Sequence, residues 1–544
     1  MAGDTITDSD EIQWLTEVLQ DSSLFTKLRK DLQREVSKSY VPLNQNDMKK
    51  SLEKYIKDSG WDITLQNAVY REIKVNPIPK LDTPDFAAKE PLQFIRKAQA
   101  TWEKRIVKSI NSMCTELSLP LATKRSAVEQ ASISSKFQTL GSDLDEKEFE
   151  RIKPVYAPKD FFEALIAVEN SNFVPLQKTP SSIKGWGLIQ VNLYAKSLDE
   201  LRCEYQELDP GLNQCGVDDA PSSSTVDVFE SDWPKLGKKV IQNGSAIAAR
   251  QYAKNGCPSG LRGQIWQQIL CLDVDDVDLL YFNQLKTYVI QHKMLVDNLV
   301  MKDIRMTATN DDDYFVFEDL LYQALLVFTR DTAVLRHFHT TCANPPKSYI
   351  KGKLGVQEYA VLHPPNGVIP FHGFSMHAAP LCYICSHAPR LYFLFRELYT
   401  RYFFRLHTMS SHPQGIMSLC VLFERLLQTH EPSLFYHLKN VGAPPLRLVF
   451  NWIVYAFSGY LSTDQVLLLW DRILAYDSLE VLPVLAMAIL SYRRCNLMEV
   501  TNLQTAQTVL ADISTLNAIA LLQYVLFLKQ YDTSFVHHGF KTTT

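Results

Sequence analysis

Apolar residues recur with the period of an α-helix along nearly the whole chain. In residues 91–117 they recur at spacings of three, four and seven, which places them on one helical face. Comparable apolar segments follow one another with short breaks over residues 238–523, and strand-like alternation is confined to residues 186–191. The pattern predicts an all-α fold. The stripe of the helix at 91–117 consists of Ile95, Trp102, Ile106, Ile110, Met113 and Leu117.

Composition narrows the class of protein. With 544 residues, of which 46% are apolar, the chain is large enough for an extensive core. The formal net charge is only −4, so no overall field attracts nucleic acid or an anionic membrane. The polar, acidic N-terminus lacks the basic and apolar regions of a secretory signal, and we expect a cytoplasmic protein. The apolar runs at 446–461 and 479–490 are too short and too interrupted to span a membrane, and they predict buried core helices.

Shifts in composition divide the chain into four parts. We expect a mainly helical N-terminal region over residues 1–205, a linker over 206–237, a second helical domain over 238–523 and a tail over 524–544. The linker is predicted because residues 209–234 are rich in Pro, Gly, Ser and Asp and have little apolar periodicity. The helix at 91–117 also has a basic face, which either docks an acidic partner or is simply solvated. That face carries Arg96, Lys97, Lys104, Arg105 and Lys108.

The block Gly256 to Trp266 has a local chemistry that agrees with its spacing. Pro258 suits the first turn of a helix, since its φ is already helical and its missing N–H has no partner there. Pro258, Arg262 and Trp266 then recur at i, i+4 and i+8, which puts them on one face. If that face is buried, the Arg262 guanidinium needs several hydrogen-bond partners.

A second motif lies far downstream, where an apolar helix carries the pair Trp470-Asp471. The pattern Gly-x-Pro-x-x-x-Arg-x-x-x-Trp and this Trp-Asp pair resemble the first and last motifs of the TBC domain family, the catalytic modules of Rab GTPase-activating proteins. The resemblance covers about half of the chain. It implies an all-helical TBC domain over residues 238–523, a Rab-family GTPase as partner and a role in vesicle trafficking. The protein would then reach endomembranes through the GTPase that it binds, and it would associate with membranes at most peripherally.

Members of this family accelerate GTP hydrolysis with an arginine and a glutamine that reach from loops into the nucleotide site of the GTPase. The chain would thus have no chemistry and no cofactor of its own, because the GTP and Mg²⁺ belong to the partner. The arginine neutralises charge that develops on the phosphoryl oxygens, and the glutamine positions the attacking water. These two residues therefore decide what the resemblance implies about activity.

Both family positions are altered in this sequence. The arginine belongs to an Ile-x-x-Asp-x-x-Arg-Thr pattern, and with Asp303 and Thr307 as anchors its slot falls on Met306. Arg305 comes one residue early, which turns a helical side chain by about 100°. It serves as a catalytic residue only if the backbone shifts register. Otherwise it is an exposed arginine, weakly paired near Asp303.

The glutamine belongs to a Tyr-x-Gln-Gly pattern, which matches Phe371-His372-Gly373 in this chain. His372 therefore occupies the glutamine slot. A neutral imidazole can donate and accept hydrogen bonds, so it can orient water, although its charge varies near neutral pH. The alternative is a histidine that bonds to backbone at a helix entry. Gly373 is retained, as a close backbone approach to a partner would require.

Two classes of function follow. The chain is either an activator of a Rab-type GTPase that uses Arg305 and His372, or a catalytically inactive module that binds a GTPase or acts as a scaffold. No metal site is predicted: Cys382, Cys385 and His387 have the spacing of half a zinc site, but no second ligand pair of that kind occurs. The alternative for these cysteines is a pair of buried thiols.

Overall fold

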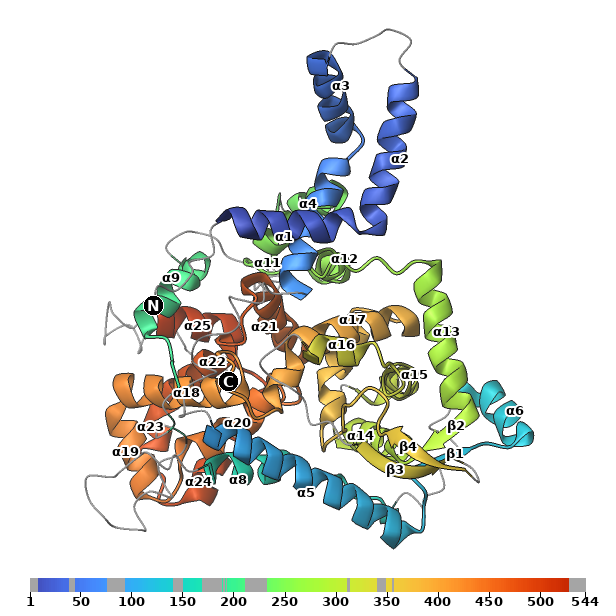
Figure 1. Cartoon of the computed structure of the whole chain (residues 1–544). Coiled ribbons are helices and arrows are strands. Elements are labelled where there is room, and N and C mark those ends of the chain that lie inside the picture. The colour runs from blue at the N-terminus through green and yellow to red at the C-terminus, as the bar shows by residue number, and fades with distance from the viewer. Residues whose placement is uncertain are drawn as a thin grey trace, which may run out of the picture.

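The computed structural model describes residues 8–38, 45–75, 93–139, 150–168, 188, 191, 193–210, 232–310, 314–339, 349–354 and 357–527. Helices make up most of this part of the chain, as Figure 1 shows, and the predicted all-α class is confirmed. The strand-like run at 186–191 falls mostly outside the described residues; Leu188 and Val191, which are described, lie in no strand. None of the described helices has the length and apolar character needed to span a membrane.

The second half of the chain packs helices around an apolar core. In α22 every side chain from Val481 to Ser491 is buried, so this helix needs neighbours on all sides. The α-helices of this half are α10 (Asp232–Asn243), α11 (Ala246–Ala253), α12 (Ser259–Ile269), α13 (Asp276–Gln291), α14 (Leu295–Asn310), α15 (Glu318–Phe328), α16 (Val334–His339), α17 (Ala388–Arg401), α18 (Ile416–His430), α19 (Pro432–Asn440), α20 (Pro445–Val454), α21 (Thr463–Tyr476), α22 (Val481–Tyr492), α23 (Arg494–Leu497), α24 (Leu503–Val509) and α25 (Ala518–Leu526). Short 3₁₀ helices join them: η7 (Phe315–Phe317), η8 (Phe374–His377), η9 (Ala379–Tyr383) and η10 (Phe403–Leu406).

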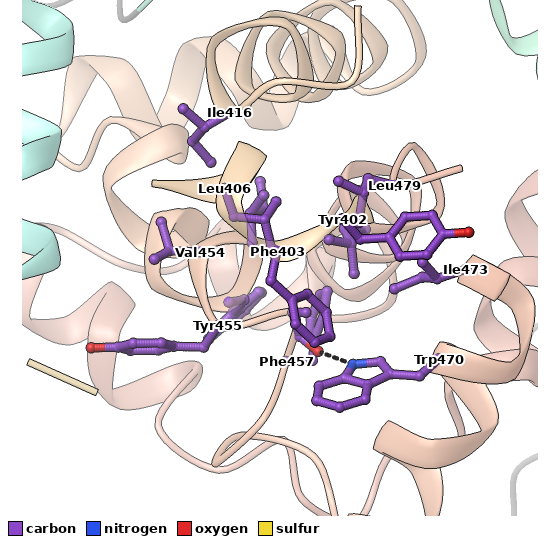
Figure 2. Packing of buried hydrophobic residues seen from close by; sticks show 14 of the residues in the cluster. Tyr402, Phe403, Leu406, Ile416, Val454, Tyr455, Phe457, Trp470, Ile473 and Leu479 are labelled. Atoms are coloured by element: carbon purple, nitrogen blue, oxygen red, sulfur yellow. Dashed lines mark hydrogen bonds between the residues drawn. The ribbon is translucent and has the colours of Figure 1, made fainter. Parts of the chain in front are cut away.

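The two apolar runs predicted to be buried core helices form α20 and α22, and that prediction is confirmed. The first run also contains a turn after α20, where Ala456 and Phe457 take left-handed φ values of 47° and 65°. The turn is held from α21, because the Trp470 indole N–H donates to the Ala456 carbonyl at 3.0 Å. Figure 2 shows this bond beside the Phe403 ring, whose centroid lies 4.8 Å from that of Trp470.

The N-terminal region is also helical and packs against the second half. Ile95, Trp102, Ile106, Ile110 and Met113 of α5 are buried, as the apolar stripe predicts, while Leu117 is half-buried. α2 and α3 extend away from the rest of the molecule in Figure 1. The elements of this region are α1 (Asp8–Gln20), α2 (Ser23–Ser37), α3 (Gln45–Asp58), α4 (Trp61–Val75), α5 (Gln93–Leu117), α6 (Ala127–Lys136), α8 (Pro158–Ile166), α9 (Leu198–Glu204) and the 3₁₀ helix η5 (Gln206–Leu208).

Aromatic contacts join α5 and α8 to the second half of the chain. Trp102 of α5 lies 5.4 Å from Phe161 of α8, and Phe162 of α8 lies 4.9 Å from Phe450 of α20, measured between ring centroids. α4 makes a separate contact, in which the Asn67 side-chain amide donates to the Gly244 carbonyl at 2.8 Å. The two halves therefore share one apolar core.

A small sheet was not foreseen from the sequence. Its strands are β1 (Ala122–Lys124), β2 (His292–Met294), β3 (Tyr349–Leu354) and β4 (Gln357–Leu362), in the order β2-β1-β3-β4. β1 of the N-terminal region pairs antiparallel with β2, with Ala122 opposite Met294. The helical domain expected over 238–523 is therefore helical apart from three short strands.

The predicted domain boundaries stay predictions. Residues 211–231 of the expected linker lie outside the described part of the chain, and so do residues 528–544 of the expected tail. Described elements occupy both ends of the linker range, with η5 at its start and the first residues of α10 at its end.

Candidate functional site

The Asp471 carboxylate joins the two motifs that carry the family resemblance. It lies on α21 with no exposed surface and accepts hydrogen bonds from two residues of α12 and from one residue just before that helix. The Cys257 backbone N–H donates at 2.9 Å, the Trp266 indole N–H at 2.6 Å and the Arg262 guanidinium at 3.2 Å. The block at 256–266 and the Trp470-Asp471 pair thus form one buried polar cluster.

Arg262 has the several partners that its burial demands. Besides Asp471, its Nη2 donates to the Cys257 carbonyl at 2.9 Å. Burial acts to lower the pKa of the guanidinium, but the Asp471 carboxylate more than offsets this, so the pKa is raised. Pro258 stands directly before α12 instead of in its first turn, and its carbonyl accepts from the Arg262 N–H at 2.9 Å. These residues build the scaffold and present no reactive group to solvent.

α14 carries both residues considered for the family arginine. We expected that arginine to reach out from a loop, and this is wrong for Arg305, which lies inside the helix. Asp303 and Thr307 of α14 both face the loop at residues 370–375, since each bonds to Ser375 there. Arg305 is turned by about 200° from Asp303 around the helix axis, whereas Met306 is turned by about 60°.

Arg305 faces α15. Burial raises the pKa of Tyr322 on that helix, and the nearby Arg305 guanidinium opposes the shift. Tyr322 donates to Glu318 Oε1 at 2.8 Å, so the neighbourhood of Arg305 also contains a carboxylate. Arg305 is half-buried, not exposed as the alternative interpretation expected. Arg305 therefore lies on the α15 side of α14, whereas Asp303 of the same helix bonds to the loop that contains His372.

The Asp303 carboxylate holds the loop at 370–375. Its Oδ1 accepts from the Gly373 N–H at 2.6 Å, and its Oδ2 accepts from the N–H and the hydroxyl of Ser375, both at 2.7 Å. Burial raises the pKa of this carboxyl, while the hydrogen bonds from Ser375 and Gly373 and the nearby His372 act in the opposite direction. The Asp303 carboxylate thus ties α14 to the loop at 370–375.

His372 has its main chain fixed on both sides. Its N–H donates to the Tyr156 carbonyl at 3.0 Å, and its carbonyl accepts from the Tyr455 hydroxyl at 2.6 Å. The side chain is half-exposed, and its Nδ1 is buried without a hydrogen-bond partner in the described part of the chain. The alternative interpretation expected a histidine that bonds to backbone. The main-chain N–H of His372 does so, whereas its side-chain Nδ1 does not.

Gly373 allows the close packing of this loop. Its φ of 85° lies in the left-handed region, and a Cβ there would come within 2.5 Å of the Tyr455 ring. Phe371 lies between two rings, stacked on Tyr156 at 5.4 Å and on Tyr455 at 6.4 Å. The loop is therefore held rigidly before any partner binds.

Sequence analysis missed Tyr156 and Tyr455. Tyr156 belongs to the N-terminal region, outside the predicted TBC domain, and nothing in its local pattern marks it as a neighbour of residue 372. Tyr455 lies in an apolar run, which predicts a core residue and gives no sign of its hydroxyl's role. The only signal was the retained Gly373, which indicates a close approach without identifying the partner.

Cys382 and Cys385 are buried thiols whose pKa values are raised by desolvation. Among the described residues, no group of three or more His, Cys, Asp or Glu side chains is arranged to hold a metal ion.

Comparison with known proteins gives three findings. The family model of the Rab-GTPase-TBC domain matches residues 368–498, which include the loop at 370–375 and α21. The human protein named TBC1 domain family member 19 is 51% identical over 517 residues, covering 95% of this chain and 97% of its own length. The GTPase-activating protein GYP5 of Saccharomyces cerevisiae is 24% identical over 262 residues, covering 47% of this chain and 24% of its own length.

A solved structure, the Chlamydomonas flagellar RabGAP TBC domain, is 14% identical with a TM-score of 0.36, and the match covers 66% of this chain and 97% of that chain.

Proposed function

The chain belongs to the TBC domain family, and on that premise we propose that it regulates a Rab-type small GTPase by binding it at α14 and the loop at 370–375. The observation that carries the proposal is the rigid attachment of this loop to α14 through Asp303. A preorganised surface loses little conformational entropy on binding. Vesicle trafficking, and a cytoplasmic location with recruitment to endomembranes by the GTPase, form part of the proposal.

The geometry favours GTPase binding over GTPase activation. An arginine that stabilises the transition state has to reach the phosphoryl oxygens of the bound nucleotide. Arg305 lies on the α15 side of α14, one turn after Met301, and the predicted arginine slot holds Met306, which carries no charge. His372 can still hydrogen-bond to the partner.

Activation is the second candidate function, and the relatives favour it. GYP5 is named as a GTPase-activating protein, and the matched family model is that of the Rab-GTPase-TBC domain. Under this candidate Arg305 and His372 supply the two catalytic groups after α14 changes register on binding.

A panel of Rab proteins tests both candidates. Binding to the full chain is measured with each Rab loaded with a non-hydrolysable GTP analogue, and single-turnover hydrolysis is measured with GTP. We expect at least one Rab to bind the native chain and to hydrolyse GTP at the same rate with and without it. The variant His372→Ala should bind that Rab more weakly. Arg305→Ala is compared with Arg336→Ala, since Arg336 is an exposed arginine on α16.

The outcomes separate the candidates. Acceleration by the native chain that is lost in Arg305→Ala and kept in Arg336→Ala would establish activation and refute binding alone. Failure of every Rab to bind would refute both.

A further inference from the structure

A basic pocket lies beside the loop at 370–375, and we propose that it docks acidic side chains of the GTPase bound at that loop. The pocket is formed by α5 and by residues 151–154 of the segment that leads to α8, and its four cationic side chains are Arg105, Lys108, Arg151 and Lys153. This inference rests on the proposed function and adds to it a second contact surface from the N-terminal region.

The charges that line the pocket are strongly unbalanced. Four cationic side chains face a volume of about 400 Å³, against the single carboxylate of Glu116. Arg105 pairs with Asp160 at 3.2 Å, but their side chains are 55% and 40% exposed, so the pair is weak and an acidic partner can compete for Arg105. Among the described residues, Arg151 donates only to the Glu116 backbone carbonyl, at 3.4 Å.

Lys108 and Lys153 leave the pocket an excess of positive charge. Both side chains are exposed, and neither has an ion pair or hydrogen bond with the described residues. Exposed lysines in a concave site concentrate the field of their charges and attract acidic groups. Carboxylates of a protein partner are the complementary chemistry.

The pocket is continuous with the candidate site. Pro154 lines the pocket and also a narrow cleft that reaches Asp303 and Phe371. Lys302 of α14 donates to the Ile152 carbonyl, and Ser109 of α5 donates to the Val155 carbonyl at 3.2 Å. The same segment ends at Tyr156, whose carbonyl accepts from the His372 N–H.

These bonds hold the pocket next to the loop at 370–375. A GTPase that contacts the loop would therefore extend over the pocket without any rearrangement of the chain. A lipid bilayer is the less favoured occupant, because it would have to meet the face that the GTPase covers under the proposed function.

The test uses the full chain and a Rab that binds in the panel above, loaded with the non-hydrolysable analogue. The variant Lys108→Glu/Arg151→Glu/Lys153→Glu reverses three pocket charges. A matched control, Lys30→Glu/Lys54→Glu/Lys57→Glu, makes the same change in net charge on exposed positions of α2 and α3. Unchanged melting temperatures show that both variants fold, and Lys108→Glu alone provides a milder variant.

We expect the pocket variant to bind about tenfold more slowly at low salt, with a dissociation rate close to native, because charges at the rim of an interface act mainly on association. The difference should shrink at high salt, where exposed charges are screened. The control variant should associate at nearly the native rate. This result would support the proposal.

Other results overturn it. Equal association rates of the native chain and the pocket variant would refute the pocket and leave the proposed function standing. If instead the pocket variant loses binding to phosphatidylserine-containing vesicles while its Rab binding is unchanged, the surface is a membrane site. If no Rab binds the native chain, the proposed function fails, and this inference fails with it.

Discussion

Replacing Asp303 with asparagine should release the loop at 370–375 from α14. The substitution keeps the size of the side chain and one accepting oxygen, but it replaces the other oxygen with an NH₂ group. In the native chain Oδ1 accepts from Gly373 and Oδ2 accepts twice from Ser375. The asparagine NH₂ must therefore face at least one backbone N–H that previously donated to a carboxylate.

The expected size of the effect follows from these bonds. A hydrogen bond to a charged group contributes about 1.5–3 kcal/mol, and an unsatisfied buried donor costs about 1–3 kcal/mol. Burial raises the pKa of Asp303, so its ionised form carries a desolvation cost that the asparagine avoids. We expect a net loss of about 2 kcal/mol, which corresponds to a change of roughly 30-fold in the opening equilibrium of the loop.

Amide hydrogen exchange measures this loss at the residues concerned. Protection of the Gly373 and Ser375 amides should fall by roughly that factor, while the amides of α22 keep their native protection. Thr307→Val is the matched control, since it removes only the contact of Thr307 with the Ser375 hydroxyl at 2.8 Å. Unchanged protection of the Gly373 and Ser375 amides in Asp303→Asn would refute the view that this carboxylate holds the loop.

Three further predictions concern single positions. Gly373→Ala should lower the melting temperature, because its Cβ would come within 2.5 Å of a tyrosine ring at a φ of 85°, whereas Gly260→Ala, with nothing within 4 Å, should be tolerated; equal melting temperatures would contradict this. Asp471→Asn should cost about 3–5 kcal/mol in urea denaturation by leaving buried Arg262 without its charge partner, and a loss under about 1 kcal/mol would show the ion pair to be dispensable. Burial lowers the pKa of His377 to about 4, so the unfolded chain takes up a proton at this residue first as the pH falls below about 6.5, and His377 alone contributes up to about 1.4 kcal/mol per pH unit to the loss of stability down to pH 4. His363, His407 and His412 add to the same decline, so His377→Asn should reduce its slope in part, and an identical slope would contradict the assignment.

Local pattern was enough to predict the fold class and the helix at 91–117. Helical periodicity is a property of neighbouring residues, so the buried face of α5 could be identified from spacing alone. The same holds for the two apolar runs that form α20 and α22. The resemblance of two motifs to those of the TBC domain family likewise indicated the family, which the human relative supports over 95% of the chain.

The sequence by itself therefore indicated the helical class and the family, both of which the structure and the human relative support, and it predicts that the family's arginine and glutamine positions hold Met306 and His372. The tertiary structure decided which residues meet: Asp471 contacts Arg262 across 209 positions, and Tyr156 of the N-terminal region bonds to His372. It also decided that Arg305 lies on the side of α14 that packs against α15, one turn after Met301, whose carbonyl accepts from Tyr322. Contacts between distant segments depend on how whole helices pack, and periodicity within one helix identifies its buried face without identifying the neighbour that covers it.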